Sequence, residues 1–185
     1  SAAYDVLDRD IFLRKAEVCR IAGSALKWLR SYLSNRSQIV QVGQGYSGQL
    51  ILDSGTPQGS ACSCLVFIMY VGDLPLWINE GFLEAYADDV FVTVEADTET
   101  ELRKKLEKEG ENIIKFFASN QLVTNVSKTA LIVFRTKNQG EPFSIELQGE
   151  IITEADEEKL LGVHVQGDLK WTKHIDKVTS DLNYG

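Results

Sequence analysis

Two short apolar runs, residues 81–87 and 90–95, flank the adjacent carboxylates Asp88 and Asp89. Two runs of strand length joined so closely predict a β-hairpin, and pairing of its strands brings both acids to the tip. One or two carboxylates, completed by phosphate oxygens, are ligands that Mg²⁺ takes in many proteins. An isolated Asp–Asp pair is more often a solvated turn, because Asp bonds its own backbone there. The hairpin therefore indicates a metal site only if other motifs accompany it.

A glycine-bounded loop, Gly55-Thr56-Pro57-Gln58-Gly59, precedes the hairpin. Glycine has no side chain, so such a loop lets the backbone approach another group closely. Ser60 is a good N-cap for the helix that follows, and the apolar stretch Ala61–Val71 predicts that this helix is buried on all sides. Pro75 should bend or end the helix. The chain thus places a close-approach loop, a buried helix and an acidic hairpin in succession.

Together these motifs resemble the palm of a reverse transcriptase, most closely of the non-LTR retrotransposon type. The resemblance rests on Gly-x-Pro-Gln-Gly-Ser at residues 55–60, Asp-Leu-Pro at 73–75 and Tyr-Ala-Asp-Asp at 86–89. Further segments match in the order of that family: Ala2-Ala3-Tyr4-Asp5, residues 28–38, Asn125-x-x-Lys128-Thr129 with Phe134, Leu160-Leu161-Gly162-Val163, and Trp171-x-x-His174-Ile175. The resemblance implies that residues 1–165 form a palm without its N-terminal fingers and first catalytic strand, and that residues 166–185 begin the thumb.

The implied reaction adds deoxynucleotides to a primer 3′-hydroxyl on an RNA template, with Mg²⁺, or alternatively Mn²⁺, as the metal pair. Asp88 and Asp89 would be catalytic and metal-binding residues, Asp88 as a principal ligand and Asp89 beside it. The other principal carboxylate of the family precedes the aromatic that matches Tyr4, at a position before Ser1. Asp5 resembles a structural Asp of the motif instead. We therefore expect residues 1–185 alone to bind Mg²⁺ weakly and to extend primers negligibly.

The resemblance assigns further residues to the nucleotide and the primer. The nucleotide-binding residues would be Tyr4, Gly55, Pro57, Gln58, Gly59 and Lys128. The primer grip would be Leu160, Leu161 and Gly162. In these roles Tyr4 would exclude a 2′-hydroxyl by steric contact, and Lys128 would lie near the pyrophosphate. Plainer alternatives are a core role for Tyr4 and Leu161, an ordinary turn for the glycine loop and a solvated Lys128.

Composition fits a single globular domain, with 44% hydrophobic and 25% charged residues in 185. A net charge of −8 is unusual for a nucleic-acid binder, because phosphates are bound largely by Lys and Arg. Basic residues concentrate between Arg9 and Arg36, so one face could still meet a phosphate backbone. The conflict is resolved if the acidic palm is one part of a polymerase whose basic fingers and thumb lie elsewhere.

Residue patterns predict an α+β fold, with helices packed on one face of an antiparallel sheet. The predicted helices are residues 10–21, 24–33, 61–71, 98–119 and 171–182. The first would be capped by Asp10 and followed by Gly23, the second capped by Ser24, and Thr98-x-x-Glu101 would form a capping box. The predicted strands are residues 37–42, 49–53, 81–87, 90–95, 130–135, 143–147 and 159–165.

Partners and location follow from the resemblance and the composition. The partners would be an RNA template, a DNA primer, deoxynucleotides, and the fingers and thumb of the same polyprotein. The longest apolar run is too short to span a bilayer, so we expect no membrane partner and an intracellular protein, nuclear or cytoplasmic. The three cysteines and two histidines predict neither a disulfide framework nor a zinc site.

Two other functions remain open at this point. The acidic charge and the missing catalytic carboxylate favour a catalytically dead palm that serves as a nucleic-acid-binding or protein-interaction module. An RNA-dependent RNA polymerase palm is the other alternative, and both the aromatic Tyr4 and the Tyr-Ala in front of Asp88 argue against it. Mg²⁺-stimulated deoxynucleotide binding would exclude the first, and a preference for ribonucleotides would favour the second.

Overall fold

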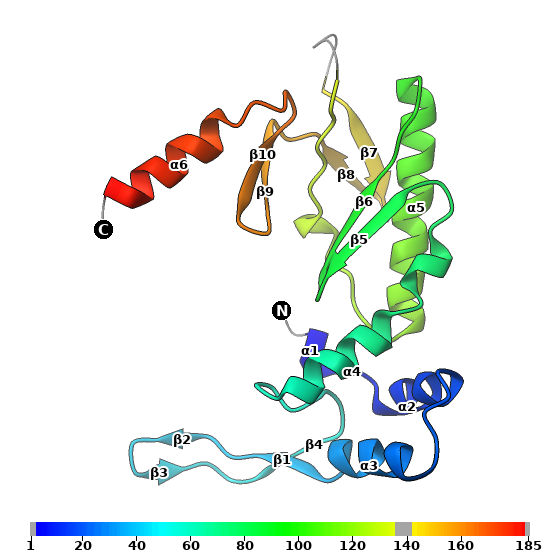
Figure 1. Cartoon of the computed structure of the whole chain (residues 1–185), viewed down its shortest axis with the longest axis vertical. Coiled ribbons are helices and arrows are strands. Elements are labelled where there is room, and N and C mark those ends of the chain that lie inside the picture. Colours follow the sequence, from blue (N-terminus) through cyan, green and yellow to red (C-terminus); the bar gives the residue numbers. More distant parts are fainter. Residues whose placement is uncertain (1–2, 136–141, 184–185) are drawn as a thin grey trace. The chain divides into compact units, whose positions relative to one another are not determined.

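The computed structural model describes residues 3–135 and 142–183 (Figure 1). The chain forms two compact units. The first comprises Ser1–Val94 and Asn112–Thr124, and the second comprises Glu95–Glu111 and Asn125–Gly185.

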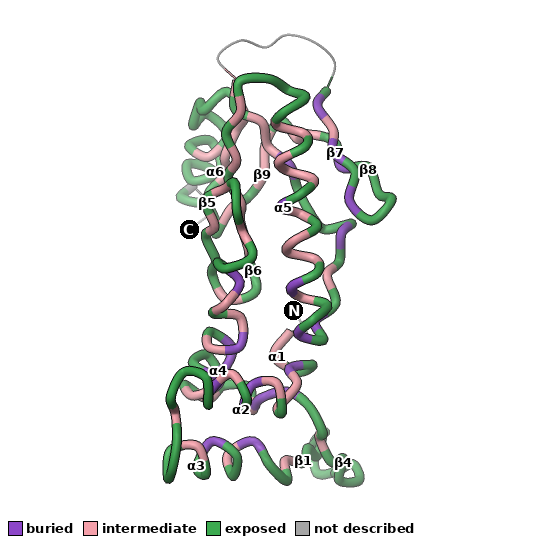
Figure 2. Tube along the Cα trace, turned by 90° about the vertical axis from the view of Figure 1, so that its right-hand side faces the viewer, coloured by how far each residue is buried: buried purple, intermediate pink, exposed green. Residues whose placement is uncertain are grey.

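The first unit is built around helices that surround one apolar core. They are α1 (Ala3–Val6), α2 (Arg9–Val18), α3 (Gly23–Leu33), α4 (Ala61–Val71) and the 3₁₀ helix η1 (Leu74–Trp77). Figure 2 shows buried segments on α2, α3 and α4. The buried core residues are Leu7, Phe12, Leu13, Ala16, Leu29, Leu33, Val66, Phe67, Tyr70 and Leu122. The predicted Ser60 cap of α4 is confirmed, since the Ser60 Oγ accepts from the Cys62 N–H. The prediction that α4 is buried on all sides is wrong, because one face packs into the core through Val66, Phe67 and Tyr70 while Leu65 and Ile68 are exposed.

The ends of α2 differ from their prediction. Asp8, not Asp10, is the N-cap, and its carboxylate accepts from the Ile11 N–H at 2.7 Å. The helix ends at Val18, where Arg20 adopts a left-handed conformation with φ 63°. The Ile21 N–H then donates to the Ala16 carbonyl, which closes the helix end as a Schellman motif. Arg20 therefore provides the left-handed residue that ends the helix, where the sequence pattern had predicted Gly23.

The start of α3 also differs from its prediction. Ser24 was expected to cap this helix, but Gly23 is its first residue. Ala22 is the N-cap and provides no side-chain hydrogen bond. The helix therefore begins without the polar cap that most helix starts use.

A two-stranded arm follows α3. Its strands are β1 (Arg36–Gln38), β2 (Gln41–Val42), β3 (Gly45–Tyr46) and β4 (Leu50–Leu52), which pair antiparallel as β1 with β4 and β2 with β3. The predicted hairpin of residues 37–42 and 49–53 is thus confirmed. Between the two ladders the Ser47 Oγ accepts from the Val40 N–H at 2.9 Å.

The acidic hairpin forms as predicted. Its strands are β5 (Phe82–Tyr86) and β6 (Asp89–Thr93), paired so that Tyr86 lies opposite Asp89. Ala87 has φ 54°, a left-handed conformation that makes the tight turn. Asp88 therefore lies in the turn itself, and Asp89 is the first residue of the returning strand.

The second unit begins with the first part of the long helix α5 (Glu99–Ser119). Thr98 caps α5 as predicted, because its Oγ1 accepts from the Glu101 N–H at 3.2 Å. The other elements are η2 (Val126–Lys128), β7 (Ser144–Leu147), β8 (Glu150–Thr153), β9 (Glu157–Leu160), β10 (Val163–Gln166) and α6 (Thr172–Asn183). Leu147 packs on Gly110, where an added Cβ would lie 2.6 Å from the Leu147 Cδ2. This contact lets β7 lie close against α5.

Two strand predictions in the second unit are wrong. Residues 130–135 form no strand, although Leu131 accepts a hydrogen bond from the Ala155 N–H at 2.8 Å. Residues 159–165 are not one strand but parts of the hairpin of β9 and β10, which turns at Leu161 and Gly162. Strand preference needs a neighbouring edge to pair with, and that edge is a property of the tertiary structure.

All strand pairs in the described residues are antiparallel, and they form separate two-stranded ladders. Helices and antiparallel strands together confirm the α+β class. The strands do not join into one continuous sheet among the described residues.

Candidate active site

The glycine loop is held against the first helix by backbone hydrogen bonds. The Gly55 N–H donates to the Leu7 carbonyl at 2.8 Å, and the Thr56 N–H donates to the Tyr4 carbonyl at 2.9 Å. Gly55 has φ +73°, and an added Cβ would lie 2.5 Å from the Asp5 carbonyl oxygen. Only glycine fits here, because a side chain would separate the two backbone segments.

A buried hydroxyl group fixes the next part of the loop. The Ser63 Oγ, on the first turn of α4, donates to the Pro57 carbonyl and accepts from the Thr56 Oγ1 at 2.8 Å. The Tyr32 hydroxyl of α3 lies 3.2 Å from the same Oγ. Ser63 and Thr56 are both buried, so these bonds have little competition from water. Pro57 therefore keeps one position relative to α4.

A pocket of about 470 Å³ opens between this loop and Tyr4. Its lining residues are Tyr4, Gln58, Gly59, Ser60, Ala61, Ser63 and Cys64. The Tyr4 ring stacks on the Phe67 ring with 4.5 Å between centroids, so the core holds its orientation. The Gln58 Nε2 donates to the Asp5 Oδ1 at 2.7 Å. The pocket thus has an aromatic wall and a polar wall.

Two residues of the acidic hairpin, Asp88 and Tyr86, affect the pKa of Tyr4. Burial raises the pKa of Tyr4 above its ordinary value of 10.0, and the neighbouring Cys64 adds to the rise. The Asp88 carboxylate and then Tyr86 raise the pKa of Tyr4 further, because a phenolate is repelled by nearby negative charge. Figure 1 shows the turn of the hairpin pointing towards α1. Asp88 and Tyr4, distant in the sequence, therefore lie near enough for their charges to interact.

Asp88 and Asp89 are both exposed to solvent. Two hard carboxylate groups fit part of a Mg²⁺ shell, which in phosphate-binding sites also uses phosphate oxygens and water. Among the described residues no group of three or more His, Cys, Asp or Glu side chains could hold a metal by itself. A metal at this tip would therefore depend on ligands beyond these two residues.

Comparison with known proteins identifies the family. The model of the family described as reverse transcriptase (RNA-dependent DNA polymerase) matches residues 1–165. The chain belongs to the reverse transcriptase family. Two similar curated proteins are both from Drosophila melanogaster. The probable RNA-directed DNA polymerase from transposon BS is 26% identical over 159 residues, 82% of this chain and 18% of the relative. The probable RNA-directed DNA polymerase from transposon X-element is 24% identical over 158 residues, 83% of this chain and 17% of the relative.

The reverse transcriptase chain thus spans less than a fifth of the length of these relatives. The family match confirms the resemblance drawn from the motifs. No helix in the part of the chain that the structure describes has both the length and the apolar character needed to cross a membrane.

The other predicted reverse transcriptase residues lie in the second unit. Lys128 is the last residue of η2 and is exposed. Leu160 ends β9, and Leu161 and Gly162 form the turn to β10 with φ 48° and 90°. The predicted primer-grip segment is therefore a hairpin turn. The first unit by itself brings together Tyr4, residues 55–59 and Asp88.

Sequence patterns missed three contributors to the site. Arg9 donates from Nε, Nη1 and Nη2 to the carbonyls of Gly55, Leu52 and Ser54 at 2.9, 2.6 and 2.7 Å. Asp5 binds Gln58, and Ser63 binds Pro57. Arg9 had been counted among basic residues facing a phosphate backbone. The clustering of basic residues cannot distinguish a solvent-facing arginine from one whose guanidinium binds the protein's own carbonyls.

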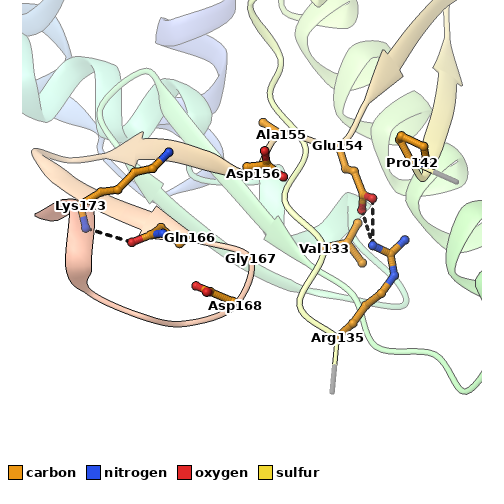
Figure 3. Close-up of a pocket in the computed structure, with 10 residues that line it drawn as sticks. All are labelled: Val133, Arg135, Pro142, Glu154, Ala155, Asp156, Gln166, Gly167, Asp168 and Lys173. Atoms are coloured by element: carbon orange, nitrogen blue, oxygen red, sulfur yellow. Dashed lines mark hydrogen bonds and ion pairs between the residues drawn. The ribbon is translucent and has the colours of Figure 1, made fainter. Parts of the chain in front are cut away.

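A second pocket, of about 520 Å³, lies within the second unit (Figure 3). Its charged lining residues are Arg135, Glu154, Asp156, Asp168 and Lys173. The Arg135 Nη1 binds both carboxylate oxygens of Glu154, at 2.6 and 2.9 Å, and hydrogen bonding to Glu154 is the main cause that raises the pKa of Arg135. The Lys173 N–H donates to the Gln166 Oε1 at 3.1 Å, and the Lys173 Nζ lies 2.6 Å from Glu157. The two basic residues of this pocket are therefore bound by protein groups.

Proposed function

We propose that this chain is the nucleotide-facing palm of an RNA-directed DNA polymerase of the non-LTR retrotransposon type, and that it binds a deoxynucleoside triphosphate in the pocket beside Tyr4. The observation that carries the proposal is the pocket lined by Tyr4, Gln58 and Gly59, with Asp88 near enough to contribute to the raised pKa of Tyr4. A triphosphate held there would have its sugar near the Tyr4 ring and its phosphates near the carboxylate tip. The family membership of residues 1–165 supports the same assignment.

The candidate site residues of the first unit have separate roles in this proposal. Asp88 and Asp89 would hold Mg²⁺, which when bound would neutralise phosphate charge during nucleotidyl transfer. The Tyr4 ring, fixed by stacking on Phe67, would exclude a 2′-hydroxyl by steric contact. Gly59 would let the backbone approach the nucleotide, and Gln58 would supply a polar contact.

The second unit would complete the polymerase. Lys128 would neutralise charge on the departing pyrophosphate, and the turn at Leu160, Leu161 and Gly162 would contact the primer end. Residues 1–165 would form the palm, with helices on one face of its strands, and residues 166–185 would begin the thumb. The template RNA, the primer and the fingers of the same polyprotein would be the partners.

Calorimetric titration of the chain with deoxythymidine triphosphate, with and without Mg²⁺, tests the metal role. We expect Mg²⁺-dependent binding that weakens roughly tenfold in Asp88→Asn, because one charged ligand is lost. The matched control is Asp97→Asn, an exposed carboxylate outside the hairpin, which should bind as wild type does. Binding that is equal in both variants would exclude Asp88 as a metal ligand.

Sugar selection tests the role of Tyr4. Tyr4→Ala should bind the ribonucleoside triphosphate nearly as well as the deoxynucleotide, because the steric wall is gone. Tyr4→Phe keeps the ring and should keep the discrimination. If Tyr4→Ala still discriminates, the ring is a core residue and another group selects the sugar.

The side chain of Gln58 provides a further test. Gln58→Ala should weaken deoxynucleotide binding and change the unfolding temperature only slightly, because the side chain is exposed. A large loss of thermal stability with unchanged nucleotide binding would make the loop an ordinary structural turn.

A protein-interaction module is the second candidate, and the arm formed by β1 to β4 favours it. Residues 37–52 contain no charged side chain in a chain with a net charge of −8. Six large apolar residues of this arm are exposed: Ile39, Val40, Val42, Tyr46, Leu50 and Ile51. An uncharged apolar surface suits a protein partner better than a phosphate backbone. Absence of any Mg²⁺-dependent deoxynucleotide binding would favour this function.

A further inference from the structure

We infer that Arg9 is a positioning residue for nucleotide binding, which holds the glycine loop in register with Tyr4. The inference rests on the proposed function and extends it to a residue outside the pocket. Arg9 is the first residue of α2, and three of its side-chain nitrogens donate to three loop carbonyls. The loop is thereby held by a residue that does not line the pocket.

The geometry requires a guanidinium. The accepting carbonyls belong to Leu52, Ser54 and Gly55, and each accepts from a different nitrogen of one planar group. A guanidinium carries donors on three nitrogens in a fixed fork, whereas a lysine ammonium is a single point at the end of a flexible chain. Lysine at position 9 would keep the charge and lose most of these bonds.

These carbonyls lie where the regular structure stops. Strand β4 ends at Leu52, and the next residues turn into the loop without a ladder partner. Backbone carbonyls at such a point need another donor. Arg9 provides that donor, so the chain leaves β4 and enters the loop along one fixed path.

The same short segment also carries Tyr4, so Arg9 joins the two walls of the pocket. The Thr56 N–H donates to the Tyr4 carbonyl, and the Ser54 Oγ donates to the Asp5 carbonyl at 2.9 Å. Arg9 directly follows Asp8, whose N–H donates to the buried Tyr70 hydroxyl at 3.3 Å. The loop is therefore tied to Tyr4 and, through Asp8, to the core.

These contacts engage each of the three nitrogens of the Arg9 guanidinium, which leaves Arg9 less available to a phosphate. Burial is the main cause that lowers its pKa below the ordinary value, and the Asp53 carboxylate opposes that shift. Four other basic residues of the same region, Arg14, Arg20, Lys27 and Arg30, are exposed. Arg9 therefore differs from them in what it binds.

Amide hydrogen exchange followed by NMR tests the inference without needing a nucleotide. In Arg9→Lys we expect the Gly55 and Thr56 amides to exchange about tenfold faster or more, because the loop opens locally. The amides of the β5–β6 hairpin should be unchanged. The matched control is Arg14→Lys, an exposed arginine on the same helix, which should leave all these rates as in wild type.

Nucleotide affinity and chemical rescue by a guanidinium compound provide a second test. The affinity for deoxythymidine triphosphate with Mg²⁺ should fall roughly tenfold in Arg9→Lys at an unchanged unfolding temperature. Added methylguanidinium should restore protection and affinity to Arg9→Ala, whereas methylammonium should not. Unchanged exchange at Gly55 and Thr56 overturns the inference, and so does faster exchange with unchanged affinity. If the wild-type chain binds no deoxynucleotide, the proposed function fails, while the exchange rates still decide whether Arg9 fixes the loop.

Discussion

The Gln58 side-chain amide donates a hydrogen bond to the Asp5 carboxylate, with 2.7 Å between Nε2 and Oδ1. This bond joins the loop to the residue directly after Tyr4, so it crosses from one wall of the pocket to the other. The bond is exposed to solvent, and water competes for both groups. Its main effect is therefore on the orientation of the amide rather than on the stability of the fold.

Replacing Asp5 should therefore weaken nucleotide binding with little effect on the stability of the fold. We expect Asp5→Ala to weaken Mg²⁺-dependent deoxynucleotide binding several-fold and to cost less than about 1 kcal/mol of unfolding free energy. Calorimetry and urea unfolding measure the two quantities. Glu17→Ala removes another exposed carboxylate and should change neither. Equal affinity in Asp5→Ala and wild type would show that the amide needs no orientation by Asp5.

Gly55→Ala should be among the most damaging small changes in the first unit. The new Cβ would meet the Asp5 backbone at 2.5 Å in a left-handed conformation, so we expect a loss of about 3 kcal/mol or more. Gly43 also has a positive φ, 60°, but an added Cβ there meets nothing within 4 Å. Gly43→Ala should cost only about 1 kcal/mol. Urea unfolding of both variants isolates the cost of the close approach, and equal losses would contradict it.

Tyr70 should make the first unit sensitive to alkaline pH. The side chain is fully buried, its hydroxyl donates to the Asn120 carbonyl at 2.6 Å, and burial raises its pKa from 10.0 to about 12. A raised pKa means that the folded state holds the proton longer than the unfolded state. The stabilisation is complete below the unfolded pKa of 10.0 and is lost as pH rises through about 12.

Comparison with Tyr70→Phe measures this effect. Wild type should lose on the order of 2 kcal/mol more unfolding free energy than Tyr70→Phe across that window. At neutral pH the variant should be less stable by about 1 to 2 kcal/mol, since the Asn120 carbonyl loses its donor. Tyr46→Phe is the control, because Tyr46 is exposed. Parallel pH profiles for wild type and Tyr70→Phe would rule out a specific role of this hydroxyl.

The stability of the second unit should depend unequally on the two carboxylates that bind Arg135. Glu154 is largely buried and binds Arg135 with both oxygens, whereas Glu99 is mostly exposed and binds at 3.1 Å. We expect Glu154→Gln to cost about 1 to 2 kcal/mol and Glu99→Gln less than about 0.5 kcal/mol. Urea unfolding at low and high salt checks both values. A larger loss of unfolding free energy in Glu99→Gln than in Glu154→Gln would contradict this expectation.

Several elements could be predicted because their causes are local. The Ser60 and Thr98 caps act within three residues, and the alternation around Asp88 and Asp89 is enough to specify the hairpin. Predictions failed where a distant edge or cap decided the outcome. Residues 130–135 have strand-forming side chains but no ladder, and β8 was not predicted at all. The left-handed Arg20 ends α2 where the pattern had indicated glycine.

By itself, the order of residues determined the family motifs, the acidic hairpin, the Ser60-capped apolar helix and the close-approach loop, because periodicity, capping and glycine geometry act between near neighbours. Only the tertiary structure decided which groups meet around the pocket. Arg9 binds Gly55 from 46 residues away, Asp5 binds Gln58 from 53, and Tyr70 binds Asn120 from 50. The physical reason is that a polar side chain takes whichever donor or acceptor the packed core brings within hydrogen-bond distance, and no local pattern encodes that partner.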